Sequence, residues 1–67
     1  MSYMSAIEAR RRAKGLTRRE LAEAAGVSIR QITRYETGEQ SPTLRVAVRL
    51  AGALGAAIDE LVDEAVA

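Results

Sequence analysis

The chain has 67 residues, 48% of them hydrophobic but only two aromatic, which favours small, closely packed helices over a sheet. It has neither His nor Cys, which excludes a disulfide, a thiolate metal site and a His general base, so we expect no metal, no cofactor and no catalytic residue. The net charge is +1 and no apolar run approaches the roughly 18 residues of a membrane span, so we expect a single cytoplasmic domain over residues 1–67.

The first predicted helix begins near Ser5 and ends at Gly15. Ser5 and Glu8 have the spacing of a capping box, in which each side chain accepts a hydrogen bond from the other residue's backbone N–H. Gly15 then offers the left-handed conformation that ends many helices.

Two further capping boxes predict helices over residues 18–25 and 29–37. Thr17 pairs with Glu20 in the first box, and Ser28 pairs with Gln31 in the second. Gly26 and Gly38 follow as stop signals. A connection of three residues that contains Gly forces a sharp crossing, so residues 17–37 are predicted to form a helix-turn-helix.

The predicted third helix has two different faces. Four residues gather on one face at the helical period: Ile29, Arg30, Thr33 and Arg34. Ile32 and Tyr35 point the opposite way, and we expect them to join a core that contains Leu21, Ala22, Leu44 and Leu50. Arg can bond O6 and N7 of guanine, and an alkyl group can contact the thymine methyl, so the first face fits the major groove of DNA. The alternative is a solvated face, although such faces usually mix charges of both signs.

The fourth helix is predicted to start at Ser41-Pro42, with Pro at the first helical position, and to stop at Gly55. Its periodicity predicts a buried side made of Leu44, Ala47, Val48, Leu50, Ala51 and Leu54. Val46, Gly52 and Ala53 are predicted to lie on its outer side.

A fifth helix over residues 58–66 is predicted from apolar positions at helical spacing among acidic residues. Residues 1–49 hold all ten Lys and Arg against five acidic residues, whereas residues 50–67 hold four acidic residues and no base. This sorting suggests a polyanion partner for the basic body. The last third of the chain is our candidate for a homodimer contact, and its acidic helix is a possible contact for a partner protein.

Residues 15–55, GLTRRELAEAAGVSIRQITRYETGEQSPTLRVAVRLAGALG, resemble the helix-turn-helix family of phage lambda repressor and Cro, also called the xenobiotic response element family. The matching positions are Leu16-Thr17, Glu20-Leu21-Ala22, Gly26-Val27-Ser28, Ile32, Arg34, Glu36, Gly38, Pro42, Leu44, Ala51 and Leu54-Gly55. AIDEL, residues 57–61, resembles the start of the family's fifth helix. The resemblance implies a compact, all-α, five-helix fold.

The resemblance also implies binding to double-stranded DNA, usually by a dimer on a palindromic operator. Ile29, Arg30, Thr33 and Arg34 match the positions that read bases. Positions that touch the DNA backbone correspond to Thr17, Arg18, Ser28, Gln40 and Arg45. Arg11 and Glu36 match a basic and acidic pair that ties the first helix to the end of the third.

Three positions depart from the family pattern. Arg18 stands where Gln is common and Ile29 where a polar residue often pairs with that Gln, so we expect Arg18 to bind phosphate as a charge. Glu39 stands where Lys or Arg is frequent and would repel the DNA backbone unless Arg45 neutralises it.

The leading hypothesis is a sequence-specific transcriptional regulator of bacterial or phage type, a repressor or small controller protein that acts at the nucleoid. The alternative is an antitoxin or protein-interaction adaptor that uses the same fold. An enzyme is the weakest alternative, because no His is present to activate a Ser. The starting Met favours a complete product over the DNA-binding portion of a longer chain.

Overall fold

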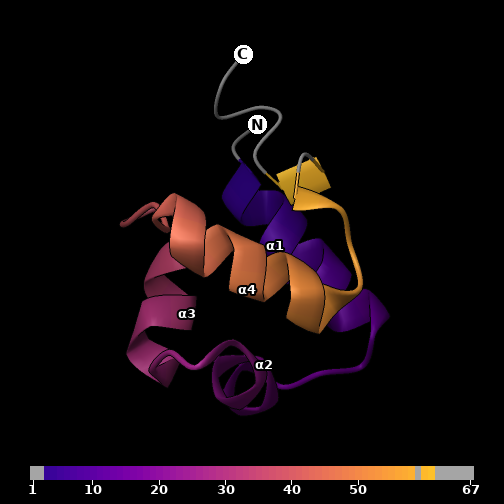
Figure 1. Ribbon diagram of the computed structural model, residues 1–67. Helices are drawn as coiled ribbons and strands as arrows, with labels where there is room; N and C mark the ends of the chain where they lie inside the picture. The colour runs from indigo at the N-terminus through magenta and orange to yellow at the C-terminus, as the bar shows by residue number, and fades with distance from the viewer. Residues whose placement is uncertain (1–2, 59, 62–67) are drawn as a thin grey trace.

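The computed structural model describes residues 3–58 and 60–61, and this part of the chain contains four α-helices. They are α1 (Tyr3–Ala13), α2 (Arg18–Ala25), α3 (Ile29–Thr37) and α4 (Leu44–Leu54). Figure 1 shows α2 at the bottom of the molecule, with α3 beside it and α4 crossing above. The predicted all-α fold and the bounds of the second and third helices are confirmed. The predicted fifth helix, residues 58–66, lies mostly outside the described residues, so the count of five is not confirmed.

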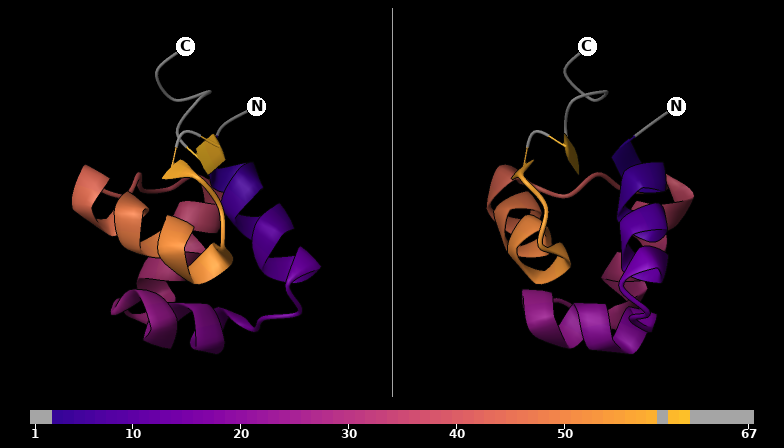
Figure 2. Two further views of the ribbon diagram at one scale, coloured as in Figure 1. Left: turned by 45° about the vertical axis from the view of Figure 1, so that its right-hand side comes forward. Right: turned by 90° about the vertical axis from the view of Figure 1, so that its right-hand side faces the viewer.

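The helices bury one apolar core between them. Helix α2 packs against α3 and α4, and α1 packs against α3 and more lightly against α4. Both views in Figure 2 show α2 beneath α1 and α4. The largest fully buried side chains are Tyr35, Ile7, Leu21, Ile32, Leu50 and Leu61. The expected burial of Ile32 and Tyr35 is confirmed, and it fixes which side of α3 faces outward.

The turn between α2 and α3 is built by local hydrogen bonds. Both predicted capping boxes are present, one at Thr17 and one at Ser28. Gly26 ends α2 with a φ of 71°, a left-handed conformation that costs other residues about 1 to 2 kcal/mol. Val27 follows and packs against the core, so the chain enters α3 after only three residues.

The predicted starts of the first and fourth helices are wrong. Helix α1 begins at Tyr3, so Ser5 lies inside the helix rather than at its N-cap. Helix α4 begins at Leu44 with Thr43 as N-cap, because the Thr43 side chain accepts a hydrogen bond from the Val46 N–H at 3.3 Å. The predicted Ser41-Pro42 start therefore lies two residues too early.

The predicted sides of α4 are partly wrong as well. Leu44 and Val48, expected in the core, are 71% and 54% exposed. Val46 and Ala53, expected outside, pack against the core instead. The buried stripe is centred on Ala47, Leu50, Ala51 and Leu54, whereas Leu44, Val48 and Gly52 follow one another at every fourth position on the open side.

Candidate nucleic-acid interface

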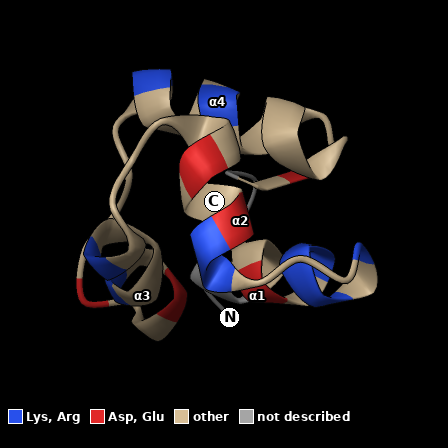
Figure 3. Ribbon diagram, turned by 90° about the horizontal axis from the view of Figure 1, so that it is seen from below, with Lys and Arg blue, Asp and Glu red and all other residues tan. Residues whose placement is uncertain are grey.

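The outward face of α3 carries the four side chains that the sequence brought together. Arg30 and Arg34 are exposed, Ile29 is 39% exposed and Thr33 is half-buried. Ile32 and Tyr35 anchor the opposite side in the core, so the helix cannot turn this face inward. Figure 3, which looks at the molecule from below, shows basic residues on α3 and at the start of α2. The interface candidate is therefore the outward face of α3 with the start of α2 beside it.

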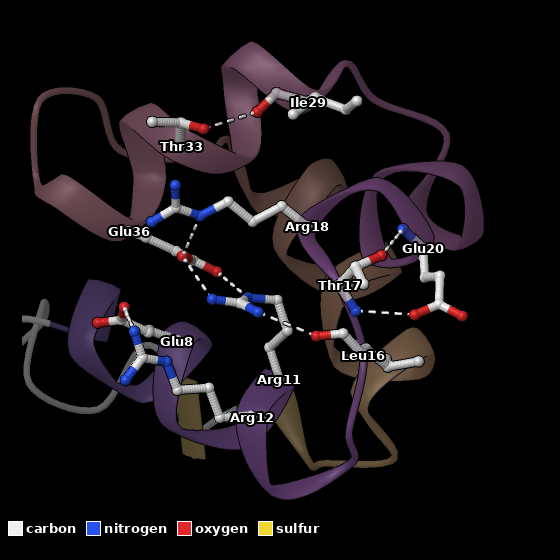
Figure 4. A network of polar contacts seen from close by, with 10 residues as sticks. All are labelled: Glu8, Arg11, Arg12, Leu16, Thr17, Arg18, Glu20, Ile29, Thr33 and Glu36. Carbon is white, nitrogen blue, oxygen red and sulfur yellow. Dashed lines mark hydrogen bonds and ion pairs between the residues drawn. The ribbon is translucent and has the colours of Figure 1, made fainter.

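Thr33 and Ile29 are joined within α3. The Thr33 hydroxyl donates to the backbone carbonyl of Ile29 at 3.1 Å, and Figure 4 shows this bond beside the Ile29 side chain. Because its single proton is used in this bond, the hydroxyl can act toward a ligand only as an acceptor. What the pair offers to a base edge is then one acceptor oxygen and aliphatic surface.

The two arginines of this face differ in whether their guanidinium has an acidic partner. Arg34 Nε lies 3.6 Å from Glu39 Oε2, and both side chains are largely exposed, so the pair is weak. The Arg30 side chain makes no hydrogen bond or ion pair to another described residue. The sequence pointed to Arg45 as the base that neutralises Glu39, but the structure places Arg34 next to it instead. Both guanidiniums remain available to donate to guanine.

Glu36 lies behind this face and binds two arginines from two other helices (Figure 4). Arg11 donates from Nε to Glu36 Oε2 at 2.6 Å and from Nη2 to Oε1 at 3.2 Å. Arg18 donates from Nε to Oε1 at 2.9 Å. The Glu36 side chain is only 1% exposed, so this carboxylate ties α1, α2 and α3 together from inside. The pair that the sequence predicted from Arg11 and Glu36 is thus in contact, and Arg18 is an additional member.

The charges in this cluster shift two pKa values. Burial alone raises the pKa of Glu36, but the hydrogen bonds from Arg11 and Arg18 and their positive charges outweigh it, so the pKa lies below its ordinary value. The hydrogen bond to Glu36 raises the pKa of Arg11 against the opposing effect of burial. Glu36 and Arg11 therefore remain an ionised pair across the physiological range.

The capping residues keep a hydrogen-bond donor free. Thr17 Oγ accepts from the Glu20 N–H at 3.0 Å, and Ser28 Oγ accepts from the Gln31 N–H at 3.1 Å. Because each hydroxyl acts as an acceptor in its cap, its own proton remains able to reach a phosphate. The backbone N–H groups of Thr17 and Ser28 are used by the Glu20 and Gln31 side chains and are not free.

The remaining predicted backbone contacts lie at the other end of α3. Gln40 is exposed, and its N–H donates to the Arg34 carbonyl at 3.2 Å, which holds the loop after α3 against the helix. Arg45 is exposed in the first turn of α4. The structure thus places the predicted site residues around α3, with Arg18 turned toward Glu36.

Besides the pair of Arg34 with Glu39, two long-range ion pairs among the described residues were not predicted from the sequence. Arg18 with Glu36 and Arg10 with Glu60 join residues far apart in the chain. No local spacing signals either pair, since each depends on how separate segments pack. Arg10 pairs with an acidic residue of the C-terminal third.

The described residues hold no group of three acidic side chains that could bind a metal ion. Asp59, Asp63 and Glu64 of the acidic tail lie outside these residues. Each helix that the structure describes is too short or too polar to cross a membrane.

Comparison with known proteins agrees with this architecture. The model of a helix-turn-helix family matches residues 7–61. The chain is 39% identical over 51 residues to the cryptic phage CTXphi transcriptional repressor RstR of Vibrio cholerae serotype O1. The matched stretch covers 76% of this chain and 46% of that protein. It is 47% identical over 49 residues to an uncharacterized HTH-type transcriptional regulator of Methanothermobacter thermautotrophicus, covering 73% of this chain and 71% of that one.

A solved structure shares the fold. The crystal structure of the clp gene regulator ClgR from C. glutamicum superposes with a TM-score of 0.84 at 33% identity, covering 96% of this chain and 83% of that one. The chain spans about half the length of the phage repressor that it matches. With the family model matching most of its length, this chain belongs to the helix-turn-helix family of the lambda repressor and Cro type.

Proposed function

We propose that this chain is a transcriptional regulator that binds double-stranded DNA with α3 in the major groove. One observation supports this most directly. Helix α3 is anchored by buried Ile32 and Tyr35 and presents Arg30 and Arg34 to the outside. A helix held in this way can be inserted into a groove about 12 Å wide without disturbing the core behind it.

The proposed base contacts follow from the chemistry of the outward face. Arg30 and Arg34 donate in pairs to O6 and N7 of guanine. Ile29 and Thr33 supply aliphatic surface that fits the methyl group of thymine. Since the Thr33 hydroxyl already donates to Ile29, we assign Thr33 no donor bond to a base. The preferred half-site therefore contains guanine next to thymine.

The proposed backbone contacts frame this face. The free hydroxyl protons of Thr17 and Ser28 donate to phosphates on one side, and Arg18 lies beside Thr17. Gln40 and Arg45 contact the backbone beyond the end of α3. Contacts of this kind fix the position of the helix and contribute most of the salt-dependent affinity.

In this proposal the whole of residues 1–67 acts as one DNA-binding domain, with the helix-turn-helix at about 17–37. It binds a palindromic operator as a homodimer through its C-terminal third, where residues 58–66 form the contact. It acts as a repressor or small controller protein in the cytoplasm, at the nucleoid, and carries out no chemistry. Regulation then comes from its concentration, its dimerisation or a partner protein at the acidic tail.

The salt dependence of DNA binding tests the proposal. The affinity for random duplex DNA is measured by fluorescence anisotropy at several salt concentrations. Each neutralised phosphate contributes about −0.9 to the slope of log K against log salt, so we expect a steep slope. A flat slope, or no binding at low salt, would favour the alternative of an antitoxin or adaptor with a protein partner.

A further inference from the structure

Two guanidinium groups pair with the single carboxylate of Glu36. Arg11 already donates to both of its oxygens, at 2.6 and 3.2 Å. Arg18 adds a second guanidinium on Oε1 at 2.9 Å. The cluster therefore carries two positive charges for one negative charge. Arg18 helps to keep Glu36 ionised, but Arg11 alone already donates to both carboxylate oxygens, and the two guanidiniums repel each other.

The excess charge is on the accessible side. The Arg18 side chain is 39% exposed, against 10% for Arg11 and 1% for Glu36. Figure 4 shows Arg18 reaching from the start of α2 across to Glu36 behind α3. The charge left over is thus presented beside the proposed DNA interface rather than hidden in the core.

Only one edge of the Arg18 guanidinium is occupied. Its Nε bonds to Glu36, and neither terminal amino group donates a hydrogen bond to another residue in the described part of the chain. The two terminal amino groups form a planar fork that matches two oxygens of a phosphate. Arg18 also directly follows Thr17, whose hydroxyl proton is free.

We propose that Glu36 is a positioning residue for DNA binding, which holds Arg18 by Nε and aims its two terminal amino groups at one backbone phosphate. This inference rests on the proposed function. Because the side chain is already held, little of its rotational freedom remains to be lost when phosphate binds. Glu36 then has two tasks: it joins the helices through Arg11 and prepares a contact through Arg18.

Arginine and lysine at position 18 should differ in how well they bind phosphate. A lysine keeps the positive charge but has one ammonium group and no separate Nε edge. If that ammonium pairs with Glu36, its remaining N–H groups stay on the same nitrogen beside the carboxylate and cannot form a separate fork toward two phosphate oxygens. We therefore expect Arg18→Lys to behave like Arg18→Ala in DNA binding while keeping more of the stability.

The experiment measures the salt slope of duplex binding for the wild type, Arg18→Lys and Arg18→Ala. Both variants should reduce the slope by about 0.9 per protomer, or about 1.8 for a dimer. Between 50 and 200 mM salt the wild-type dimer should then lose about twelvefold more affinity than either variant. Arg19→Lys and Arg19→Ala are matched controls, since Arg19 is the exposed neighbour. Arg19→Lys should retain the wild-type slope.

A second variant tests Glu36 itself. Glu36→Gln, measured at a temperature where circular dichroism shows it folded, should lower the slope even though Arg18 is still present. If this variant does not fold, the comparison of Arg18→Lys with the wild type decides alone.

Each of the following results would overturn the proposal. Arg18→Lys with the wild-type slope would show that Arg18 acts as a simple charge. Arg18→Ala with lower stability but an unchanged slope would show a purely structural role. A flat slope in the wild type would overturn the proposed function and this inference with it, whereas a steep wild-type slope that neither Arg18 variant changes overturns the inference alone.

Discussion

Replacing Arg11 with methionine removes the main polar tie between α1 and α3. Arg11 donates two bonds to Glu36, and its Nη1 donates a third to the Leu16 carbonyl at 2.9 Å. Without Arg11, the 1% exposed side chain of Glu36 keeps Arg18 as its partner. Loss of one partner from a buried pair costs about 3 to 5 kcal/mol, and since Arg18 compensates in part, we expect about 2 to 4 kcal/mol.

This loss is large for so small a protein. A chain of 67 residues has an unfolding free energy of about 3 to 10 kcal/mol. The midpoint of thermal unfolding should fall by at least about 8 °C. Urea and thermal unfolding, followed by circular dichroism at 222 nm, measure both quantities.

Arg12→Met is the matched control for this measurement. Arg12 forms an ion pair with Glu8 at 2.9 Å, four residues earlier, but its side chain is 69% exposed. Such a pair contributes about 0.3 to 0.5 kcal/mol, so this variant should be almost as stable as the wild type. If Arg11→Met costs no more than Arg12→Met, the reasoning about the buried pair is refuted.

A double variant separates the lost bond from the unpaired charge. Arg11→Met combined with Glu36→Leu replaces both charged groups by apolar ones of similar size, which is often neutral or stabilising. It should therefore recover most of the stability lost in Arg11→Met. A double variant less stable than Arg11→Met alone would contradict this explanation.

Three further predictions use other features of the structure. Folding lowers the pKa of Glu36, so the ionised carboxylate contributes to the free energy of unfolding above about pH 4.3, the ordinary Glu value. This contribution is lost as the pH falls through the lower pKa of the folded state. Acid titration should therefore destabilise the wild type more steeply than Glu36→Gln. Thr33→Ser keeps the hydroxyl and loses the methyl group, so its affinity for a thymine-containing site should fall about fourfold by anisotropy, and replacing that thymine by uracil should weaken the wild type but not the variant. Gly26→Ala should destabilise by about 1 to 2 kcal/mol because its φ is 71°, whereas Gly52→Ala should stabilise α4 by about 1 kcal/mol in urea unfolding, since open space surrounds its added methyl group.

Local chemistry explains why α2, α3 and their turn could be predicted from sequence. A capping box involves only four consecutive residues, and a left-handed Gly ends a helix whatever packs against it. The bounds of these helices are therefore determined locally, by Thr17, Ser28 and Gly26. The outward face of α3 follows for the same reason, since the period of the helix and two apolar anchors determine it.

The start and the buried side of α4 were predicted wrongly because the local sequence is compatible with two N-caps and with two buried faces. Thr43 and Ser41 are both acceptable caps, and only the packing decides between them. Leu44 and Val48 are apolar and at helical spacing, but α1, α2 and the segment after α4 cover the other side of the helix. Which half of an apolar surface is covered depends on neighbours that the periodicity does not describe.

In the candidate site too, contacts within one helix could be predicted from the sequence, whereas contacts between helices could not. The four residues on the outward face of α3 share one helix, and the sequence brings them together. The bond from Arg18 to Glu36 spans 18 positions and two helices, so it depends on the angle at which α2 crosses α3. A charged side chain with two possible partners, phosphate or carboxylate, has no sequence signal that chooses between them.

The most direct test of major-groove reading by α3 combines protein and base substitutions. A duplex selected by the wild type from a random library is prepared with 7-deazaguanine at each guanine in turn, which removes N7 as an acceptor. At one position the change should weaken the wild type about tenfold or more but leave Arg30→Ala unaffected, and a second position should pair in the same way with Arg34→Ala. Equal binding of the selected duplex by the wild type and both alanine variants would contradict the claim that α3 reads DNA.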